Sequence, residues 1–141
     1  MIVLVIIATI VAIAIPSMLR SRMNANEGAA VGAMRVISSA EISFQAAGVD
    51  KTPAGISQYG DLNALGTSEP PFIDPVLATG FKQGYTFLAE PSLDAGAPIF
   101  IVTGLPSDPG KTGIKTYYTD DSGTIRFEGD GSPPTAESPA L

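Results

Sequence analysis

The chain has 141 residues and a formal net charge of −6 at pH 7, and it contains neither histidine nor cysteine. Its length is sufficient for one domain with a hydrophobic core and short for two. Without histidine and cysteine the chain lacks the commonest general base and metal ligand, and it can form neither disulfide bonds nor thiol-linked haem. We therefore expect a protein that is not an enzyme and has no cofactor.

The charge is unevenly distributed along the chain. Residues 1–49 carry three arginines and two glutamates, whereas residues 50–141 carry five lysines and arginines and twelve aspartates and glutamates. An acidic surface repels phosphate groups. We therefore expect the C-terminal part to bind no nucleic acid.

The first fifteen residues, MIVLVIIATIVAIAI, contain Thr9 as their only polar residue. As a helix they would extend ~22 Å, less than the ~30 Å hydrocarbon core of a membrane. That length alone fits a signal-peptide core or a buried helix, but no basic segment precedes it and no small-residue cleavage pattern follows. We expect the apolar segment to begin upstream of Met1. A monomer in water would leave it exposed, so it must enter a membrane or an assembly.

A helical pattern continues beyond Pro16. Apolar residues recur in steps of three and four with Asn26 as the one polar exception: Leu19, Met23, Ala30, Ala33, Ile37, Ala40, Phe44 and Ala47. This spacing predicts one apolar stripe on a helix, and Gly48 is a typical stop signal. We predict a helix from Met1 to Ala47, packed against a sheet through Ala30, Ala33, Ile37, Ala40 and Phe44.

Pro16 allows two interpretations of this helix. Inside a helix, proline removes one backbone hydrogen bond and costs ~3 kcal/mol, which predicts a kink or local unwinding over Val11 to Ile15. Alternatively, Pro16 lies in the first turn of a new helix and Ile15 is extended. We favour the interrupted helix because no turn-forming cluster precedes the proline.

The remainder of the chain reads as loops and strands. Residues 48–83 are rich in glycine and proline, with a helical turn expected from Asp61 to Leu65 and capped by Asp61. Strands are predicted at residues 84–90, 98–104, 113–119 and 123–128, the last two joined by the short connection DDSG. One face of this sheet would cover the helix and the other would face water.

The expected fold class is therefore α+β, with one long N-terminal helix and a small antiparallel sheet of three or four strands. We divide the chain into an apolar segment at residues 1–24, a globular head at residues 25–128 and a tail at residues 129–141. The tail is rich in glycine, proline and serine, so it should bury no core and form a tail or a coil on the surface.

Two patterns suggest ligand chemistry but have ordinary explanations. Residues 104–112, GLPSDPGKT, end like a P-loop, but the glycine spacing is wrong, two prolines replace phosphate-binding N–H groups, and a strand follows. Asp120 and Asp121, with Glu128 and Asp130, are weak candidates for calcium ligands. No calcium-loop motif is present, and turn formation explains these aspartates equally well. We expect no metal site.

Two features after the apolar segment have several possible roles. Arg20 and Arg22 could be cytoplasmic anchors, bind lipid headgroups, or pair with Glu27 or a neighbouring subunit. Arg20, Arg22 and Arg35 could equally lie on a solvated helix face. Gly28 and Gly32 form a G-x-x-x-G pattern that favours close approach of another backbone. That backbone could belong to the sheet or to a second subunit.

Residues 2–41, IVLVIIATIVAIAIPSMLRSRMNANEGAAVGAMRVISSAE, resemble the N-terminal region of type IV pilins and related pseudopilins. The specific part is the apolar run ending in A-I-P and followed by S-x-L-R-S-R-x-N-A-N-E. Residues 60–66, 74–87 and 117–127 are more weakly similar to the globular part of some cysteine-free bacterial pilins. By this match the family's leader, N-terminal aromatic residue and nearby acidic residue would lie upstream of Met1. The family's usual C-terminal disulfide loop is missing, because the chain has no cysteine.

The resemblance implies a pilin that begins in the inner membrane, is processed by a prepilin peptidase, and is assembled by pilus machinery with copies of itself. The product would be an extracellular filament on the cell surface. In this family the chain near the matching proline often loses helicity in the filament, and Arg20 and Arg22 would lie on the exported side. The filament core would contain Ile2, Leu4, Ile6, Ile10, Ile13, Ile15 and Leu19. The alternatives are a pseudopilin of a type II secretion system and a monomeric membrane-anchored periplasmic module.

Overall fold

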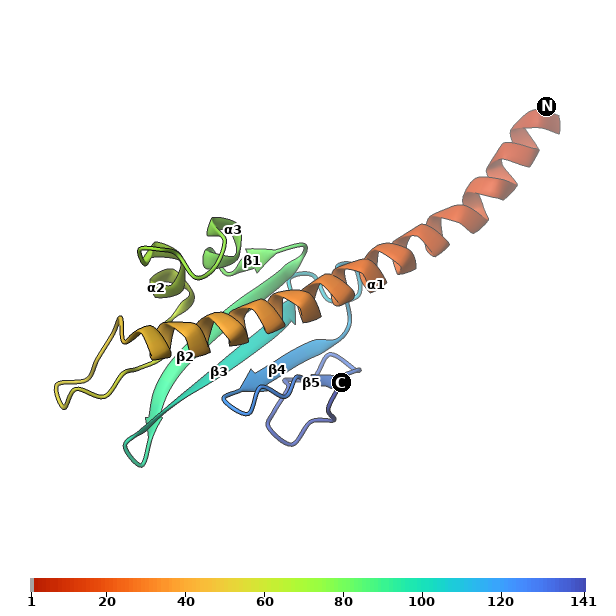
Figure 1. Cartoon of the computed structure of the whole chain (residues 1–141). Helices are drawn as coiled ribbons and strands as arrows, with labels where there is room; N and C mark the ends of the chain where they lie inside the picture. Colours follow the sequence, from red (N-terminus) through yellow and green to blue (C-terminus); the bar gives the residue numbers. More distant parts are fainter. Residues whose placement is uncertain (1) are drawn as a thin grey trace.

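A computed structural model of the chain describes residues 2–141. It has the expected α+β fold, a long N-terminal helix followed by an antiparallel sheet of five strands in the order β1-β2-β3-β4-β5. Figure 1 shows the C-terminal half of α1 lying across the sheet and the N-terminal half projecting away from it. The elements are α1 (Ile2–Ala47), α2 (Leu62–Thr67), α3 (Pro75–Ala78), β1 (Phe81–Lys82), β2 (Tyr85–Asp94), β3 (Ala97–Pro106), β4 (Thr116–Asp120) and β5 (Arg126–Glu128).

Helix α1 is continuous over 46 residues, with Pro16 inside it. Local unwinding of Val11 to Ile15, one of the two distortions expected there, is therefore wrong for this structure, and so is the alternative of a new helix at Pro16. The proline removes one hydrogen bond, but the turns on either side remain intact, and Figure 1 shows a gradual curve of the projecting half. At the other end, Gly48 ends the helix as predicted, with a φ of 64°.

The C-terminal half of α1 supplies one side of the hydrophobic core. The five residues predicted to face the sheet, Ala30, Ala33, Ile37, Ala40 and Phe44, are all buried. They share the core with Leu62 and Leu65 of α2, Leu77 of α3, and Tyr85, Phe87, Phe100, Val102 and Tyr117 of the sheet. The Phe44 ring meets the edge of the Phe72 ring with their centroids 5.6 Å apart, which fixes the end of the helix over the loop after α2.

The two central strands are longer than expected, and β1 was not predicted. β2 and β3 pair from Tyr85↔Pro106 to Asp94↔Ala97, so the hairpin continues through Pro91 to a turn at Ala95 and Gly96. In β2, buried and exposed side chains alternate through Ala89, after which every residue is exposed. The end of this hairpin therefore extends past the core, in a part of the strand where the hydrophobic pattern has stopped.

The last two strands are shorter than predicted, and their connection is longer. The β4–β5 pairing ends at Tyr118↔Arg126, so β5 begins at Arg126 and not at residue 123. Gly123 takes the expected positive φ of 71°, and its N–H donates to the Asp120 carbonyl over 2.9 Å. The carbonyl of Ile125 accepts a hydrogen bond from the N–H of Leu141. At Ile125 the backbone therefore pairs with the C-terminal segment and not with β4.

Residues 129–141 form a coil on the surface, one of the two forms predicted for this segment. The coil runs back along β5, where the Phe127 N–H donates to the Pro139 carbonyl over 3.0 Å. The Ser132 carbonyl of the same coil accepts a hydrogen bond from the Thr116 hydroxyl over 2.6 Å. Residues 116–119 of β4 are consequently buried on both faces of the strand. The prediction of one wet sheet face is wrong for β4.

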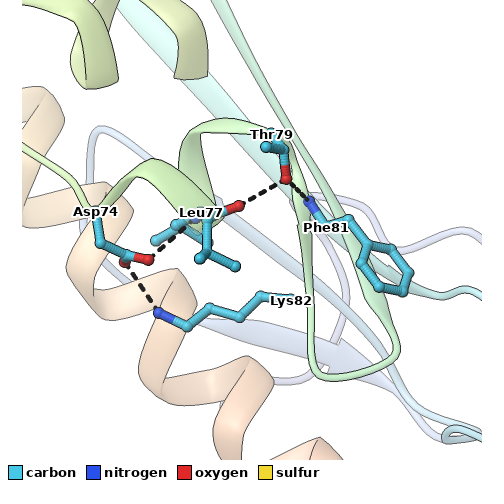
Figure 2. Close-up of polar contacts among 6 residues, drawn as sticks. Asp74, Leu77, Thr79, Phe81 and Lys82 are labelled. Carbon is cyan, nitrogen blue, oxygen red and sulfur yellow. Dashed lines mark hydrogen bonds and ion pairs between the residues drawn. The ribbon is translucent and has the colours of Figure 1, made fainter.

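Two short capped helices close the side of the core above α1. Asp61 caps α2 as predicted, accepting from the Ala64 N–H over 2.7 Å, and Leu62 and Leu65 face inward. The unpredicted helix α3 begins in the same way, because Asp74 accepts from the Leu77 N–H. Figure 2 shows how Asp74 also binds the Lys82 ammonium, 2.9 Å away, which joins α3 to β1. This ion pair holds the pKa of Asp74 below its ordinary value.

Candidate assembly surface

The projecting half of α1, from Ile2 to Leu19, exposes its side chains in every direction. All seven residues predicted for an assembly core lie here and are at least half exposed: Ile2, Leu4, Ile6, Ile10, Ile13, Ile15 and Leu19. An exposed apolar surface of this length is unfavourable in water. We call this projecting part of α1, from Ile2 to Leu19, the stem. The stem requires an apolar environment that the rest of the chain does not supply.

The backbone and polar groups of the stem suit such an environment. Its lone polar side chain, Thr9, donates its hydroxyl to the Val5 carbonyl over 2.8 Å, so this hydroxyl is satisfied within the helix. Pro16 is the exception, because it leaves the carbonyl of Ala12 without its usual helical donor, which is unfavourable in an apolar environment. Within residues 2–141, α1 is the helix long and apolar enough to cross a membrane by length and composition.

The G-x-x-x-G pattern lies on the exposed face of α1. Gly28 and Gly32 are both exposed, and a methyl group added to either one would meet no atom within 4 Å beyond the adjacent residues and the nearby backbone of α1 itself. Of the two partners considered from the sequence, the sheet is therefore not the one that approaches these glycines.

The arginines after the apolar segment make no ion pair in the part of the chain that the structure describes. Ion pairs within residues 2–141 join Lys82 to Asp74, Lys111 to Asp108 and Lys115 to Glu27. Arg20, Arg22 and Arg35 are all exposed. The possibility that Arg20 or Arg22 pairs with Glu27 of the same chain is therefore wrong in this structure.

Glu27 instead joins α1 to the segment before β4. One carboxylate oxygen accepts from the N–H groups of Ile114 and Lys115, 3.0 and 3.4 Å away, and the other lies 3.3 Å from the Lys115 ammonium. Burial would raise the pKa of Glu27, but these hydrogen bonds and the nearby positive charge outweigh it, and the pKa is lowered. Asn26, the polar residue in the apolar stripe, donates to the Thr112 carbonyl over 2.9 Å. Together they fix the point where the stem enters the head.

Glu41 makes a second polar link from the buried face of α1. It is fully buried, and its Oε2 accepts from the Gly60 N–H over 3.0 Å. Its Oε1 has no hydrogen-bond partner within the described residues. Burial, with the charge of Asp61 added, raises the pKa of Glu41 to about 7. Neither Glu27 nor Glu41 was singled out from the sequence for these contacts, although each lies beside the predicted apolar stripe.

The two sequence patterns that suggested ligands form ordinary turns. After β3, the Lys111 ammonium lies 2.8 Å from Asp108 of the same turn, and a bend and β4 follow where a phosphate site would need a helix. Gly113 in this segment lies directly against the Tyr85 hydroxyl, in a space too small for a side chain. Asp120 accepts from the N–H and hydroxyl of Ser122. No group of potential metal ligands occurs within residues 2–141.

The sequence and the structure were compared with known proteins. No protein-family model matches the sequence, and searches of curated proteins and of solved structures found no match either.

Proposed function

We propose that this protein is a pilin, the structural subunit of a type IV pilus-like filament. One observation carries the proposal, namely that a single helix is the backbone of a folded head and also extends far beyond it as an uncovered apolar stem. A monomer has nothing with which to cover the stem, whereas copies in parallel can cover one another's stems. A contact that relates copies head to tail without closing produces a filament.

The same stem explains a membrane stage before assembly. From Ile2 to Leu19 the helix is ~27 Å long at 1.5 Å per residue, close to the thickness of the hydrocarbon core. Stems held in the inner membrane would exchange lipid for neighbouring stems when pilus machinery extracts the subunit. The resemblance of residues 2–41 to type IV pilins supports this order of events.

Electron microscopy of cells that make the protein tests the proposal. Surface filaments labelled by an antibody to residues 129–141, and present in the sheared fraction, are the expected result. The matched control is a strain without this gene, whose sheared fraction should lack the label. Filaments that never contain this chain would contradict a pilin. Short periplasmic assemblies would then indicate the pseudopilin, and monomers in the membrane would indicate an anchored module.

A further inference from the structure

A cleft of about 600 Å³ opens at the end of the head farthest from the stem. One wall is the exposed part of β2 at Pro91, Ser92 and Leu93, and the other is the segment from Gln58 to Asp61 together with Asp50. Figure 1 places the two walls, the extended β2–β3 hairpin and the loop after α1, at the end of α1 opposite the N-terminus. The projecting hairpin makes this cleft, because β2 continues beyond the core residues it shares with α1.

The cleft is acidic. Asp50 and Asp61 line it, and no lysine or arginine does. The neighbouring Lys51 does not line the cleft, and its side chain lies over Gly48. Glu41 lies behind the wall at Gly60, where its Oε2 accepts from the Gly60 N–H and its buried Oε1 has no hydrogen-bond partner within the described residues.

The basic groups that could enter this cleft are few. Lys82, Lys111 and Lys115 are engaged in ion pairs of their own chain, and the guanidinium of Arg126 donates to the Ser138 carbonyl. Four further cations, Arg20, Arg22, Arg35 and Lys51, make no ion pair within residues 2–141. Arg35 and Lys51 belong to the head, whereas Arg20 and Arg22 lie outside it, where the stem begins. The helix from Arg22 to Ala47 extends ~38 Å, so these arginines cannot reach the cleft of their own chain.

We infer that the cleft lined by Asp50 and Asp61 receives the Arg20–Arg22 segment of a second copy of this chain. The inference rests on the proposed filament, in which this contact would join the head of one copy to the stem end of another. Copies that point the same way and are offset by about the length of the head bring the arginines of one to the cleft of another. The contact is heterologous, because it joins two different surfaces. Each copy binds one neighbour through its cleft and another neighbour through its arginines, so the series of copies continues without closing into a ring.

Disulfide cross-linking tests the contact, because the chain has no cysteine of its own. Ser21 lies between the two arginines and Ser92 lines the cleft, and both are exposed, so Ser21→Cys with Ser92→Cys changes little else. In sheared filaments under mild oxidation we expect a ladder of multimers on a non-reducing gel. Each single variant should give no ladder, and the matched pair Ser39→Cys with Ser92→Cys, which places the helix cysteine within the head, should give monomers.

Charge reversal provides a second test. Arg20→Glu with Arg22→Glu should reduce filament yield by about tenfold or more, because it places like charges at the contact. Adding Asp50→Lys with Asp61→Asn should restore part of the yield, and asparagine keeps the cap of α2. Normal filaments without the Ser21–Ser92 ladder overturn this contact and leave the proposed function standing. Loss of membrane retention with no effect at Asp50 would indicate lipid headgroups and also overturns it. Absence of filaments from the unchanged chain overturns both.

Discussion

The two halves of α1 have similar secondary structure and opposite surroundings. Between Ile2 and Leu19 every side chain is exposed, whereas between Glu27 and Phe44 each turn places residues in the core. The first half is apolar all round, and the second is apolar on one stripe with polar links at Glu27 and Glu41. Folding of the head and the proposed assembly therefore depend on different residues of one helix. Substitutions in one half should affect assembly without affecting folding of the head, and substitutions in the other half should affect folding.

The largest effect is expected for a charge in the stem. Ile10→Asp should abolish filaments, because one aspartate in an apolar helix bundle or membrane costs ~2.5–3.5 kcal/mol per copy and every copy carries it. The head should still fold, with unchanged urea unfolding of the full chain in detergent micelles. Ile10→Leu is the matched control and should assemble normally. Normal filaments from Ile10→Asp would mean that the stem is not an assembly surface.

The next largest effect is expected in the packed half of the helix. Phe44→Ala should lower the free energy of unfolding by ~3–5 kcal/mol, because Phe44 is 1% exposed and fills the core against Phe72. Urea unfolding in micelles, followed by tyrosine fluorescence, measures the change. Ile42→Ala is the control, since Ile42 lies on the same helix and is 50% exposed. Its effect should stay within ~0.5 kcal/mol. Equal losses would contradict the assignment of Phe44 to the buried face of this half and of Ile42 to its exposed face.

A pH-dependent effect is expected at Glu41. Because its pKa rises from 4.5 to about 7 on folding, the folded head retains a proton that the unfolded chain releases. The contribution of Glu41 to stability should therefore be greatest below about pH 4.5, fall by ~3 kcal/mol as the pH rises towards 7, and level off above that.

Glu41→Gln removes this charge and keeps an acceptor for the Gly60 N–H. The melting temperature of the variant should exceed that of the unchanged chain at pH 8 and should approach it at pH 5. Glu69→Gln, at an exposed position, is the control and should leave the pH profile unchanged. A Glu41→Gln profile that still falls between pH 5 and 7 would contradict the role of Glu41.

The smallest effect is expected at the junction of the two halves. Glu27→Ala should cost ~1–3 kcal/mol at pH 7, because it leaves the N–H groups of Ile114 and Lys115 without their acceptor. Glu27→Gln should cost less because it keeps one acceptor. Since the pKa of Glu27 is lowered, its contribution is present above pH 4.5 and is lost as the pH falls through the lowered value. Urea unfolding at pH 7 and pH 3 checks this, and equal losses at both pH values would contradict it.

The local features of this protein follow from short-range patterns in its sequence. Hydrophobic spacing gave the length of α1 and its buried residues from Ala30 to Phe44, because a helix repeats every 3.6 residues whatever surrounds it. Gly48 and Asp61 were identified because helix ends need a particular φ angle or a side-chain acceptor. The exposed apolar stem was also visible, since composition alone shows that those residues need an apolar environment.

Contacts between segments that are distant in the chain became known from the folded structure alone. The coil at residues 129–141 covers β4 and takes the backbone bonds of Ile125, and no local pattern in either segment encodes that pairing. Glu27 contacts Lys115 and Glu41 contacts Gly60 across long stretches of chain, so neither partner follows from spacing. The cleft beside Asp50 likewise exists because the β2–β3 hairpin extends past the core and meets a loop more than thirty residues earlier in the chain.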